Sequence, residues 1–263
     1  MRELSPTDRY TTPKRPLTCL TRRVPGLVFY TRMINVIFRC AWLGKRRRLK
    51  GAPYARQSWR LLRAMEAAGG RFDIQGLDVL RRIEGPAVYV GNHMSSLETF
   101  VIPAIIRPFH DMTFVVKESL TRYPVFKHVM NGQDPIVVGR VNPREDLKTI
   151  LEEGLRNLAQ GVSVVVFPQT TRTLVFDPAQ FNSIGVKLAL KAGVPVVPIA
   201  LTTDAWGNGK RLKDFGKIDP SRPIRFAIGE PIMPTGNGRE AQQQAVDFIQ
   251  GHFDNWMGHA RRD

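Results

Sequence analysis

A histidine and an acidic residue separated by four residues, His93 and Glu98, have the types and spacing of a general base and its partner. A carboxylate that holds an imidazole ring allows the ring to take a proton from a hydroxyl group near neutral pH. The apolar run before them predicts a buried strand, and the residues after Ser95 predict the start of a helix. We therefore expect His93 in the turn at the strand's end and Glu98 in the first helical turn, where the two side chains can meet.

The same residues also allow a purely structural interpretation. Ser95 and Glu98 match a capping box, in which the acid satisfies backbone N–H groups at the start of a helix. The pair on its own does not decide between catalysis and capping, so the rest of the chain has to be considered.

Strand and helix patterns alternate along the chain after residue 70. Short apolar runs predict strands at residues 72–74, 88–90, 113–116, 136–138, 162–167, 194–201 and 224–228. Helical patterns cover residues 55–68, 96–106, 143–159, 183–192 and 239–257. This alternation predicts an α/β domain with a mixed, mostly parallel central sheet flanked by helices.

Basic residues follow several of the predicted strands directly. Lys117 comes after Val116, Arg140 comes two residues after Val138, and Arg172 lies in the polar stretch after residues 162–166. Ligands of open α/β sheets bind outside the carboxyl ends of the strands, so these side chains and His93 are expected around one crevice. Each basic residue alone is typical of a solvated surface, but several at consecutive strand ends favour an anion site, and the planar fork of arginine suits a phosphate.

The chain has 263 residues and a formal net charge of +16, which is distributed unevenly. Residues 1–63 contain 16 Lys or Arg and 2 Asp or Glu, whereas residues 64–263 contain 23 basic and 21 acidic residues. The chain is thus a nearly neutral domain with a basic N-terminal segment. Such a segment favours a polyanionic partner, which is either a nucleic acid or an anionic membrane surface.

Residues 24–44 are mostly apolar and are interrupted by Arg32 and Arg39, which fall on one face of a helix. A helix that spanned a membrane would carry both charges into hydrocarbon, which is costly, whereas an interfacial helix would hold them among the headgroups. A polybasic run follows at residues 45–48 and Lys50. The alternative is a helix that packs on the domain and leaves an arginine stripe in water. The apolar face, to which Phe29, Ile37, Phe38 and Trp42 are expected to contribute, together with the polybasic run favours a membrane-binding, two-helix N-terminal appendage.

Residues 1–23 are polar and basic, and we expect them to be poorly ordered and not to act as a signal peptide. The two cysteines, Cys19 and Cys40, permit no disulfide framework and predict a reduced compartment. The scattered histidines and cysteines show no metal-ligand spacing. The sequence also lacks a nucleophile elbow, a Walker loop and a dinucleotide-binding loop.

Four sequence blocks occur in the order found in one enzyme family. They are Asn92-His93 with Glu98, Gly132 through Gly139-Arg140, the run Phe167-Pro168-Gln169-Thr170-Thr171-Arg172, and Val194-Pro195 with Pro198. In this order the chain resembles the glycerolipid acyltransferase family, of which 1-acylglycerol-3-phosphate acyltransferase is typical. The resemblance covers about residues 72–232, and it implies a division into a basic segment with interfacial helices at 1–65 and an acyltransferase domain at 66–263.

The resemblance implies a role for each matching residue. His93 is expected to remove the proton from an acceptor hydroxyl, and Glu98 to hold its ring. The expected substrate-binding residues are Lys117, Arg140, Thr170, Thr171 and Arg172. Acyl-CoA or acyl-carrier protein would be the co-substrate, with no metal and no other cofactor. The expected place of action is the cytoplasmic face of the inner membrane.

Two departures from the family pattern bear on these expectations. Glu98 replaces the usual aspartate and is one methylene longer, but it can still orient an imidazole. Gln169 and Thr170 replace a glutamate and a glycine in the third block, which removes a charge and a glycine that tolerates unusual backbone angles.

Other hypotheses remain open at this point. An acyltransferase for a different lipid acceptor, such as an acylated amino acid or another lysophospholipid, fits the same blocks. A nucleic-acid-binding protein would explain the basic segment but not the four blocks, and no aromatic stacking platform is found, so we expect no nucleic acid. A membrane-bound scaffold without activity is the third possibility.

Overall fold

Eight strands form one central sheet in the computed structural model, which describes residues 8–46, 48–122, 134–169, 171–209 and 214–259. The strand order across the sheet is β1-β2-β8-β7-β3-β6-β4-β5. The strands are β1 (Arg9–Thr11), β2 (Phe72–Gln75), β3 (Val88–Gly91), β4 (Met112–Lys117), β5 (Ile136–Val138), β6 (Ser163–Val166), β7 (Val196–Thr202) and β8 (Ile224–Ile228).

The sheet is mixed and mostly parallel, as the sequence predicts. Strands β7, β3, β6, β4 and β5 are neighbours and run parallel, as do β2 and β8. The β1–β2 and β7–β8 pairs are antiparallel. The carboxyl ends of β3, β6, β4 and β5 therefore lie along one edge of the sheet, where the predicted site residues follow the strands.

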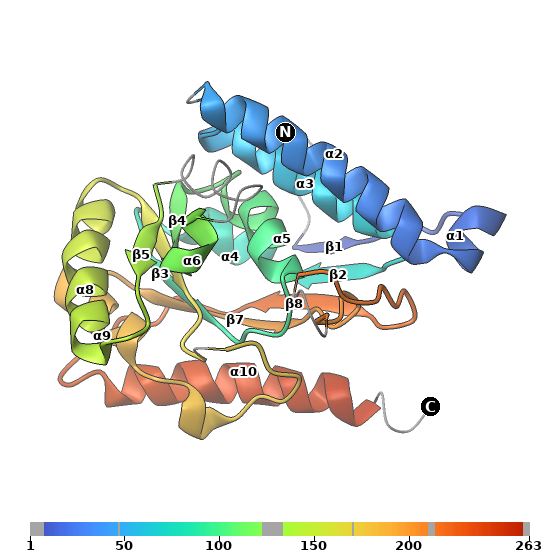
Figure 1. Ribbon diagram of the computed structural model, residues 1–263. Coiled ribbons are helices and arrows are strands. Elements are labelled where there is room, and N and C mark those ends of the chain that lie inside the picture. Colours follow the sequence, from blue (N-terminus) through green and yellow to red (C-terminus); the bar gives the residue numbers. More distant parts are fainter. Residues whose placement is uncertain (1–7, 47, 123–133, 170, 210–213, 260–263) are drawn as a thin grey trace.

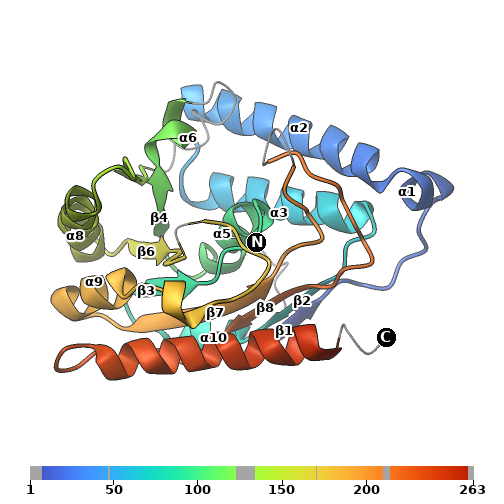
Figure 2. The same ribbon diagram turned by 60° about the horizontal axis from the view of Figure 1, so that its bottom comes forward.

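Helices cover both faces of the sheet, as Figures 1 and 2 show. On one side α5 (Leu97–Ile106) and α3 (Gly51–Ala67) lie next to each other, and α2 (Pro25–Lys45) packs on α3 as the outermost helix. On the other side α10 (Arg239–His259) runs along β7, and α9 (Ile184–Ala192) contacts β3 and β7. Helix α8 (Pro143–Ala159) packs on β5, β6 and α9. The shorter helices are α1 (Cys19–Arg23), α4 (Leu77–Arg82), α6 (Glu118–Arg122) and the 3₁₀ turn η1 (Pro178–Gln180).

Helices α2 and α3 occupy the N-terminal part of the chain, and their inner faces belong to the same hydrophobic core as the sheet, so a separate two-helix appendage is not confirmed. Helix α2 buries five side chains at helical spacing: Phe29, Met33, Val36, Ile37 and Cys40. The expectation that Phe29 and Ile37 contribute to an outward apolar face is wrong, because they are 0% and 3% exposed. The division of the chain at residue 65 and the membrane role of these helices stay predictions.

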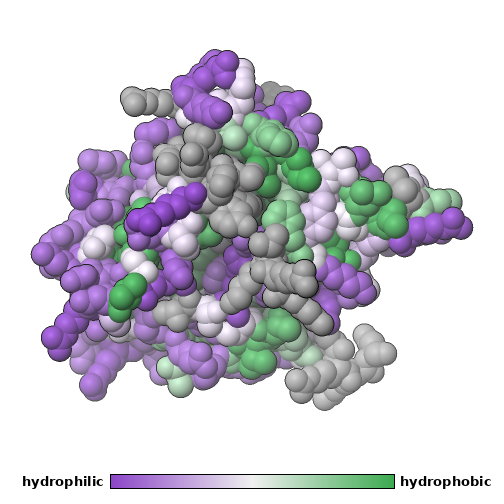
Figure 3. All heavy atoms as spheres, in the orientation of Figure 1, coloured by the Kyte–Doolittle hydropathy of each residue, from purple (hydrophilic) through white to green (hydrophobic). Residues whose placement is uncertain are grey.

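A second apolar stripe lies on the outward side of α2. Its side chains are Val24, Leu27, Ile34, Phe38 and Trp42, which are between 39% and 67% exposed. Their spacing of three, four or seven residues places them on one face of the helix. Figure 3 shows apolar residues over α2 next to strongly hydrophilic ones. Among the described helices, none is both long and apolar enough to cross a membrane.

The expectation of poor order over residues 1–23 is wrong for the described part of that segment. Residues Arg9–Thr11 form edge strand β1 on β2, and Arg9 makes a bidentate ion pair with Asp73 at 2.6 Å. The hydroxyl of Tyr10 donates to Glu66 of α3 at 2.8 Å. These partners lie more than 50 residues away in the sequence, so no local pattern indicated the strand.

Candidate active site

The end of strand β3 places His93 beside the neighbouring strand. Gly91 approaches β7 so closely that an added Cβ would lie 3.1 Å from the Ile199 carbonyl oxygen. The next residue, Asn92, is 1% exposed, and its amide exchanges two hydrogen bonds of 2.9 Å with the backbone of Leu201. The chain is thus held to β7 at the two residues before the turn, and His93 follows as the first side chain free of the sheet.

Glu98 caps the helix start and holds the histidine at the same time. Its Oε1 atom accepts from the backbone N–H groups of Met94 at 2.7 Å and Ser95 at 2.8 Å, and it lies 2.8 Å from Nδ1 of His93. Its Oε2 atom accepts from the hydroxyls of Thr203 at 2.6 Å and Ser95 at 3.0 Å. The capping and catalytic interpretations of the sequence are therefore compatible, because one carboxylate oxygen serves both.

The environment of Glu98 favours its charged form. Glu98 is completely buried, which by itself would raise its pKa, but the hydrogen bond and the charge of His93, with the hydrogen bonds from Thr203 and Ser95, lower the pKa below its ordinary value. Because Oε1 of an ionised carboxylate only accepts, Nδ1 of His93 must carry the proton. When the ring is neutral, its lone pair lies on Nε2, as a general base requires.

Phe167 fixes the plane of the histidine ring. The rings of His93 and Phe167 are stacked with centroids 4.5 Å apart and planes 16° apart. Phe167 is also stacked with Phe114, with ring centroids 6.3 Å apart. Phe167 directly follows β6 and Phe114 lies within β4, so the neighbouring parallel strands orient the imidazole.

We expect Glu98→Gln to cost about 2 kcal/mol of unfolding free energy at neutral pH, the scale of hydrogen bonds to a charged group. A carboxylate with a lowered pKa stabilises the fold above its unfolded-state pKa and loses this contribution as the pH falls through its folded-state pKa. The stability gap between wild type and Glu98→Gln should therefore be widest above pH 4.5 and narrow on acidification. Urea unfolding at a series of pH values measures the gap, and a gap independent of pH would refute this account of Glu98.

A cavity of about 460 Å³ lies at the carboxyl edge of the sheet and brings the predicted residues together. Its lining includes His93, Lys117, Arg140, Thr171 and Arg172. Lys117 ends β4, Arg140 follows β5, and Thr171 and Arg172 follow β6, so the parallel strands converge on one place as expected. Thr170, the fifth predicted substrate-binding residue, and Gly132 of the second block lie outside the described residues.

Two of the cavity's guanidinium groups influence each other. Partial burial lowers the pKa of Arg140, Asp146 raises it, and the positive charge of Arg172 lowers it again. Arg140 also has a left-handed backbone with φ of 57°, and the N–H groups of Gly139 and Arg140 both donate to Asp146 at 3.1 and 3.3 Å. Asp146, in the first turn of α8, thus supports a strained turn that presents Arg140 at the cavity.

Arg172 is held by an acid that the sequence did not point to. One of its terminal nitrogens donates to Asp214 at 2.8 Å, and the same Asp214 oxygen accepts from the hydroxyl of Ser96 at 2.7 Å. The loop that carries Asp214 contacts α2, because the hydroxyl of Tyr30 donates to the Gly216 carbonyl and its ring stacks on Phe215. An anion that bound Arg172 would have to share the guanidinium with Asp214 or displace it.

Gln169, which stands where the family pattern has a glutamate, lies in the loop next to His93. Gln169 is 2% exposed, its Oε1 accepts from the backbone N–H of His93 at 3.3 Å, and its Nε2 donates to Thr173 at 3.3 Å. The Thr173 N–H in turn donates to the His93 carbonyl at 2.9 Å. Gln169 is not among the residues that line the cavity. It therefore supports the position of His93 from behind.

The described residues contain no cluster of three or more His, Cys, Asp or Glu side chains suited to a metal ion. Cys19 and Cys40 are both free thiols, and burial raises the pKa of Cys40 to about 12. Cys40 therefore stays protonated and packs in the core.

The part of the chain that contains the histidine–glutamate pair matches a known protein family. Residues 71–202, just over half of the chain, match the acyltransferase family, and the chain belongs to that family. The resemblance seen in the four sequence blocks is thereby confirmed.

Individual relatives agree with this assignment. The chain is 34% identical over 174 residues to a 1-acyl-sn-glycerol-3-phosphate acyltransferase of Pseudomonas aeruginosa, a match that covers 66% of this chain and 64% of the relative. It is 28% identical over 165 residues to an enzyme of the same name from Cocos nucifera, covering 62% of this chain and 51% of the relative. The matches thus span less than two thirds of these relatives' lengths.

The fold is similar to that of a solved protein. The crystal structure of the 1-acyl-sn-glycerophosphate (LPA) acyltransferase PlsC from Thermotoga maritima superposes with a TM-score of 0.66. The match covers 88% of this chain and 94% of that protein, with 18% sequence identity, so it bears on the fold alone.

Proposed function

We propose that this protein transfers a fatty acyl group from acyl-CoA or acyl-carrier protein to the free hydroxyl of a lysophospholipid, with 1-acylglycerol-3-phosphate as the acceptor. The observation that carries the proposal is the buried Glu98 carboxylate on Nδ1 of His93, at a cavity that also presents Lys117, Arg140 and Arg172. The names of the relatives support the choice of acceptor.

The reaction follows from the tautomer of His93. Nε2 accepts the proton of the acceptor hydroxyl while the oxygen attacks the thioester carbonyl, and Glu98 stabilises the imidazolium that forms. Collapse of the tetrahedral intermediate breaks the carbon–sulfur bond, and the proton passes from His93 to the thiolate. The products are the new ester and a free thiol, so no covalent acyl-enzyme is required.

The cations of the cavity hold the acceptor's phosphate. Arg172 supplies a planar fork, and Lys117 and Arg140 supply further positive charge from neighbouring strand ends. Holding the phosphate fixes the hydroxyl relative to Nε2, and this positioning lowers the barrier by reducing the entropy that the reaction would otherwise lose.

We expect Arg172→Lys to raise the apparent KM for the acceptor, because a point charge cannot replace the bidentate fork. The acceptor KM should rise about tenfold, which corresponds to the loss of one hydrogen bond to a charged group. The KM for the acyl donor should change little. Steady-state kinetics with each substrate varied in turn measures the two constants.

Asp214→Asn is the matched comparison for that experiment. It removes the charge that competes for Arg172, so we expect the acceptor KM to fall or stay level. Equal effects of Arg172→Lys on donor and acceptor, or loss of the folded state, would assign Arg172 a structural role instead.

The protein is further proposed to act at the anionic, cytoplasmic face of the inner membrane, with α2 lying in the interface. The outward stripe of Phe38, Trp42 and their neighbours supports this placement, as does the basic run after α2. Both acceptor and product are amphiphiles, so a membrane surface would bring them to the cavity. Nucleic acid is not expected as a partner.

A mass-spectrometric screen tests the reaction. Purified protein is incubated with a panel of lysolipids and acylated amino acids, with acyl-CoA or acyl-carrier protein as the donor. We expect acylation of 1-acylglycerol-3-phosphate that depends on His93. Acylation of another lipid alone would retain the chemistry and correct the acceptor, an outcome that the Gln169–Thr170 departure makes worth testing. No acylation of any acceptor by folded protein would favour a scaffold.

A further inference from the structure

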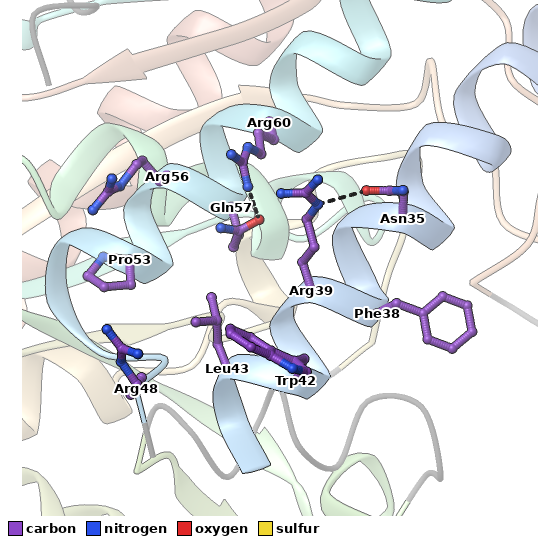
Figure 4. Close-up of a pocket in the computed structure, with 10 residues that line it drawn as sticks. All are labelled: Asn35, Phe38, Arg39, Trp42, Leu43, Arg48, Pro53, Arg56, Gln57 and Arg60. Carbon is purple, nitrogen blue, oxygen red and sulfur yellow. Dashed lines mark hydrogen bonds between the residues drawn. The ribbon is translucent and has the colours of Figure 1, made fainter. Parts of the chain in front are cut away.

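A second pocket, separate from the catalytic cavity, lies in the groove between α2 and α3. Its volume is about 490 Å³, within the range of small-molecule sites, and it shares no lining residue with the catalytic cavity. Figure 4 shows side chains from both helices reaching into the space between them.

Arginine dominates the groove. Four of its lining residues are arginines: Arg39 from α2, Arg48 from the connection between the helices, and Arg56 and Arg60 from α3. No acidic residue lines it, and residues 25–60 of the sequence contain nine Lys or Arg and no Asp or Glu. Within the described ranges, none of the four arginines forms a salt bridge with a carboxylate. Like charges gathered in this way create a positive potential that attracts an anion from outside the chain.

Two neutral amides orient two of the four arginines. The Nε atom of Arg39 donates to Oδ1 of Asn35 at 3.0 Å, which leaves the two terminal nitrogens for a ligand. A terminal nitrogen of Arg60 donates at 3.0 Å to Oε1 of Gln57, a residue only 6% exposed. Such pre-oriented guanidinium forks match the oxygen pairs of a phosphate group.

The rim of the groove is apolar. Phe38 and Trp42 line it, are 67% and 51% exposed, and also belong to the outward stripe of α2. Arg46 covers one face of the Trp42 ring at 4.0 Å from its centroid. A free phosphate ion has nothing to place against such a rim, whereas a phospholipid has acyl chains beside its phosphate. A nucleic-acid base could stack only on the opposite face of the Trp42 ring.

We propose that the groove between α2 and α3 binds the phosphate of one anionic phospholipid of the membrane, held by Arg39, Arg48, Arg56 and Arg60 with its acyl chains against Phe38 and Trp42. This site rests on the proposed placement of α2 at the membrane, and it adds a discrete, saturable lipid site to a general attraction. The bound lipid is not the acyl acceptor, because the groove contains none of the catalytic cavity's residues.

The test measures binding of a soluble anionic lipid to the full chain by isothermal titration calorimetry. Dihexanoyl phosphatidylglycerol is used as monomers, because it carries the phosphate and short acyl chains but is neither acceptor nor product of the proposed reaction. We expect saturable binding of one molecule per chain at an ionic strength of about 0.15 M, where the Debye length is about 8 Å. Dihexanoyl phosphatidylcholine carries a quaternary ammonium group that cancels the charge of its phosphate, and inorganic phosphate has no acyl chains. Each should therefore bind at least about tenfold more weakly.

Two double variants separate a site from diffuse attraction. Arg56→Gln with Arg60→Gln should weaken phosphatidylglycerol binding by at least about tenfold, on the scale of 1 kcal/mol for each basic residue at an anionic surface. Arg32→Gln with Lys45→Gln removes the same charge from exposed positions of α2 that do not line the groove, and should weaken binding by less than about threefold. Arg172→Gln should leave this binding in place, because Arg172 belongs to the catalytic cavity.

Each other outcome overturns the proposal. Equal weakening by the two double variants means diffuse charge, equal binding of inorganic phosphate means a site for soluble anions, and loss of binding in Arg172→Gln places the lipid in the catalytic cavity. Tighter binding of a single-stranded oligonucleotide that is lost with Arg56 and Arg60 assigns the groove to nucleic acid. The titration contains no acyl donor, so an inactive enzyme would still reveal the site, and an absent site would leave the acyltransferase assay unaffected as a separate test.

Discussion

Replacing His93 by alanine is expected to lower the turnover number by roughly 10²–10⁴, the usual scale for loss of a general acid–base catalyst. The loss should appear in the chemical step, because the residues that hold the phosphate are unchanged. Glu98 would still accept from Met94, Ser95 and Thr203 and continue to cap α5, so the fold should persist. Turnover is measured with saturating donor and acceptor, and circular dichroism checks the fold.

His252→Ala is the matched control for this variant. His252 lies on α10 between Phe248 and Trp256, and it does not line the catalytic cavity. Its removal should leave turnover within about twofold, as for a residue that contributes no proton transfer. If folded His93→Ala protein turned over at the wild-type rate, the general-base mechanism would be wrong.

The second large effect concerns the membrane. We expect Phe38→Glu with Trp42→Glu to abolish binding to anionic vesicles at any salt concentration, whereas high salt should weaken binding of the wild type only partly. Salt screens the attraction between basic side chains and lipid headgroups but not the burial of aromatic rings in the interface. Vesicle flotation over a series of salt concentrations measures both quantities.

A control pair carries the same chemical change on other elements. Val175 and Met233 are 67% and 57% exposed, and neither belongs to α2, so Val175→Glu with Met233→Glu should leave vesicle binding nearly intact. The α2 double variant should also leave any binding to DNA or RNA almost unchanged. Complete release of the wild type by salt alone, together with tight and salt-sensitive nucleic-acid binding, would contradict the interfacial helix and favour the nucleic-acid hypothesis.

Local sequence signals predicted the elements that surround the site. The bounds of α8, β5 and β8 agree with the prediction to the residue. Helix α8 begins at Pro143 after Asn142, whose side chain accepts from the Arg144 N–H at 3.1 Å, so its start depends on neighbouring residues only. Strand β1 depends instead on pairing with β2, more than 60 residues away in the sequence, and the sequence pattern did not indicate it.

The site likewise contains residues that the sequence predicted and residues that it missed. The carboxyl ends of parallel strands must share an edge, so strand order along the chain was enough to bring Lys117, Arg140 and Arg172 toward His93. Thr203 and Asp214 were missed because they meet Glu98 and Arg172 only through the folding of distant loops, 105 and 42 residues away. A threonine after a strand or an aspartate in a loop carries no signal of such a role by itself.

The sequence by itself determined that residues 24–44 form an amphipathic, basic helix, because periodicity and charge are properties of the chain. Only the tertiary structure decided which apolar side chains of α2 face inward. Phe29 and Ile37 are buried against the domain, while Phe38 and Trp42 remain outside. The physical reason is that a helix with apolar residues on two faces can bury either one, and the choice depends on the shape that α3 and the loop around Trp206 offer to it.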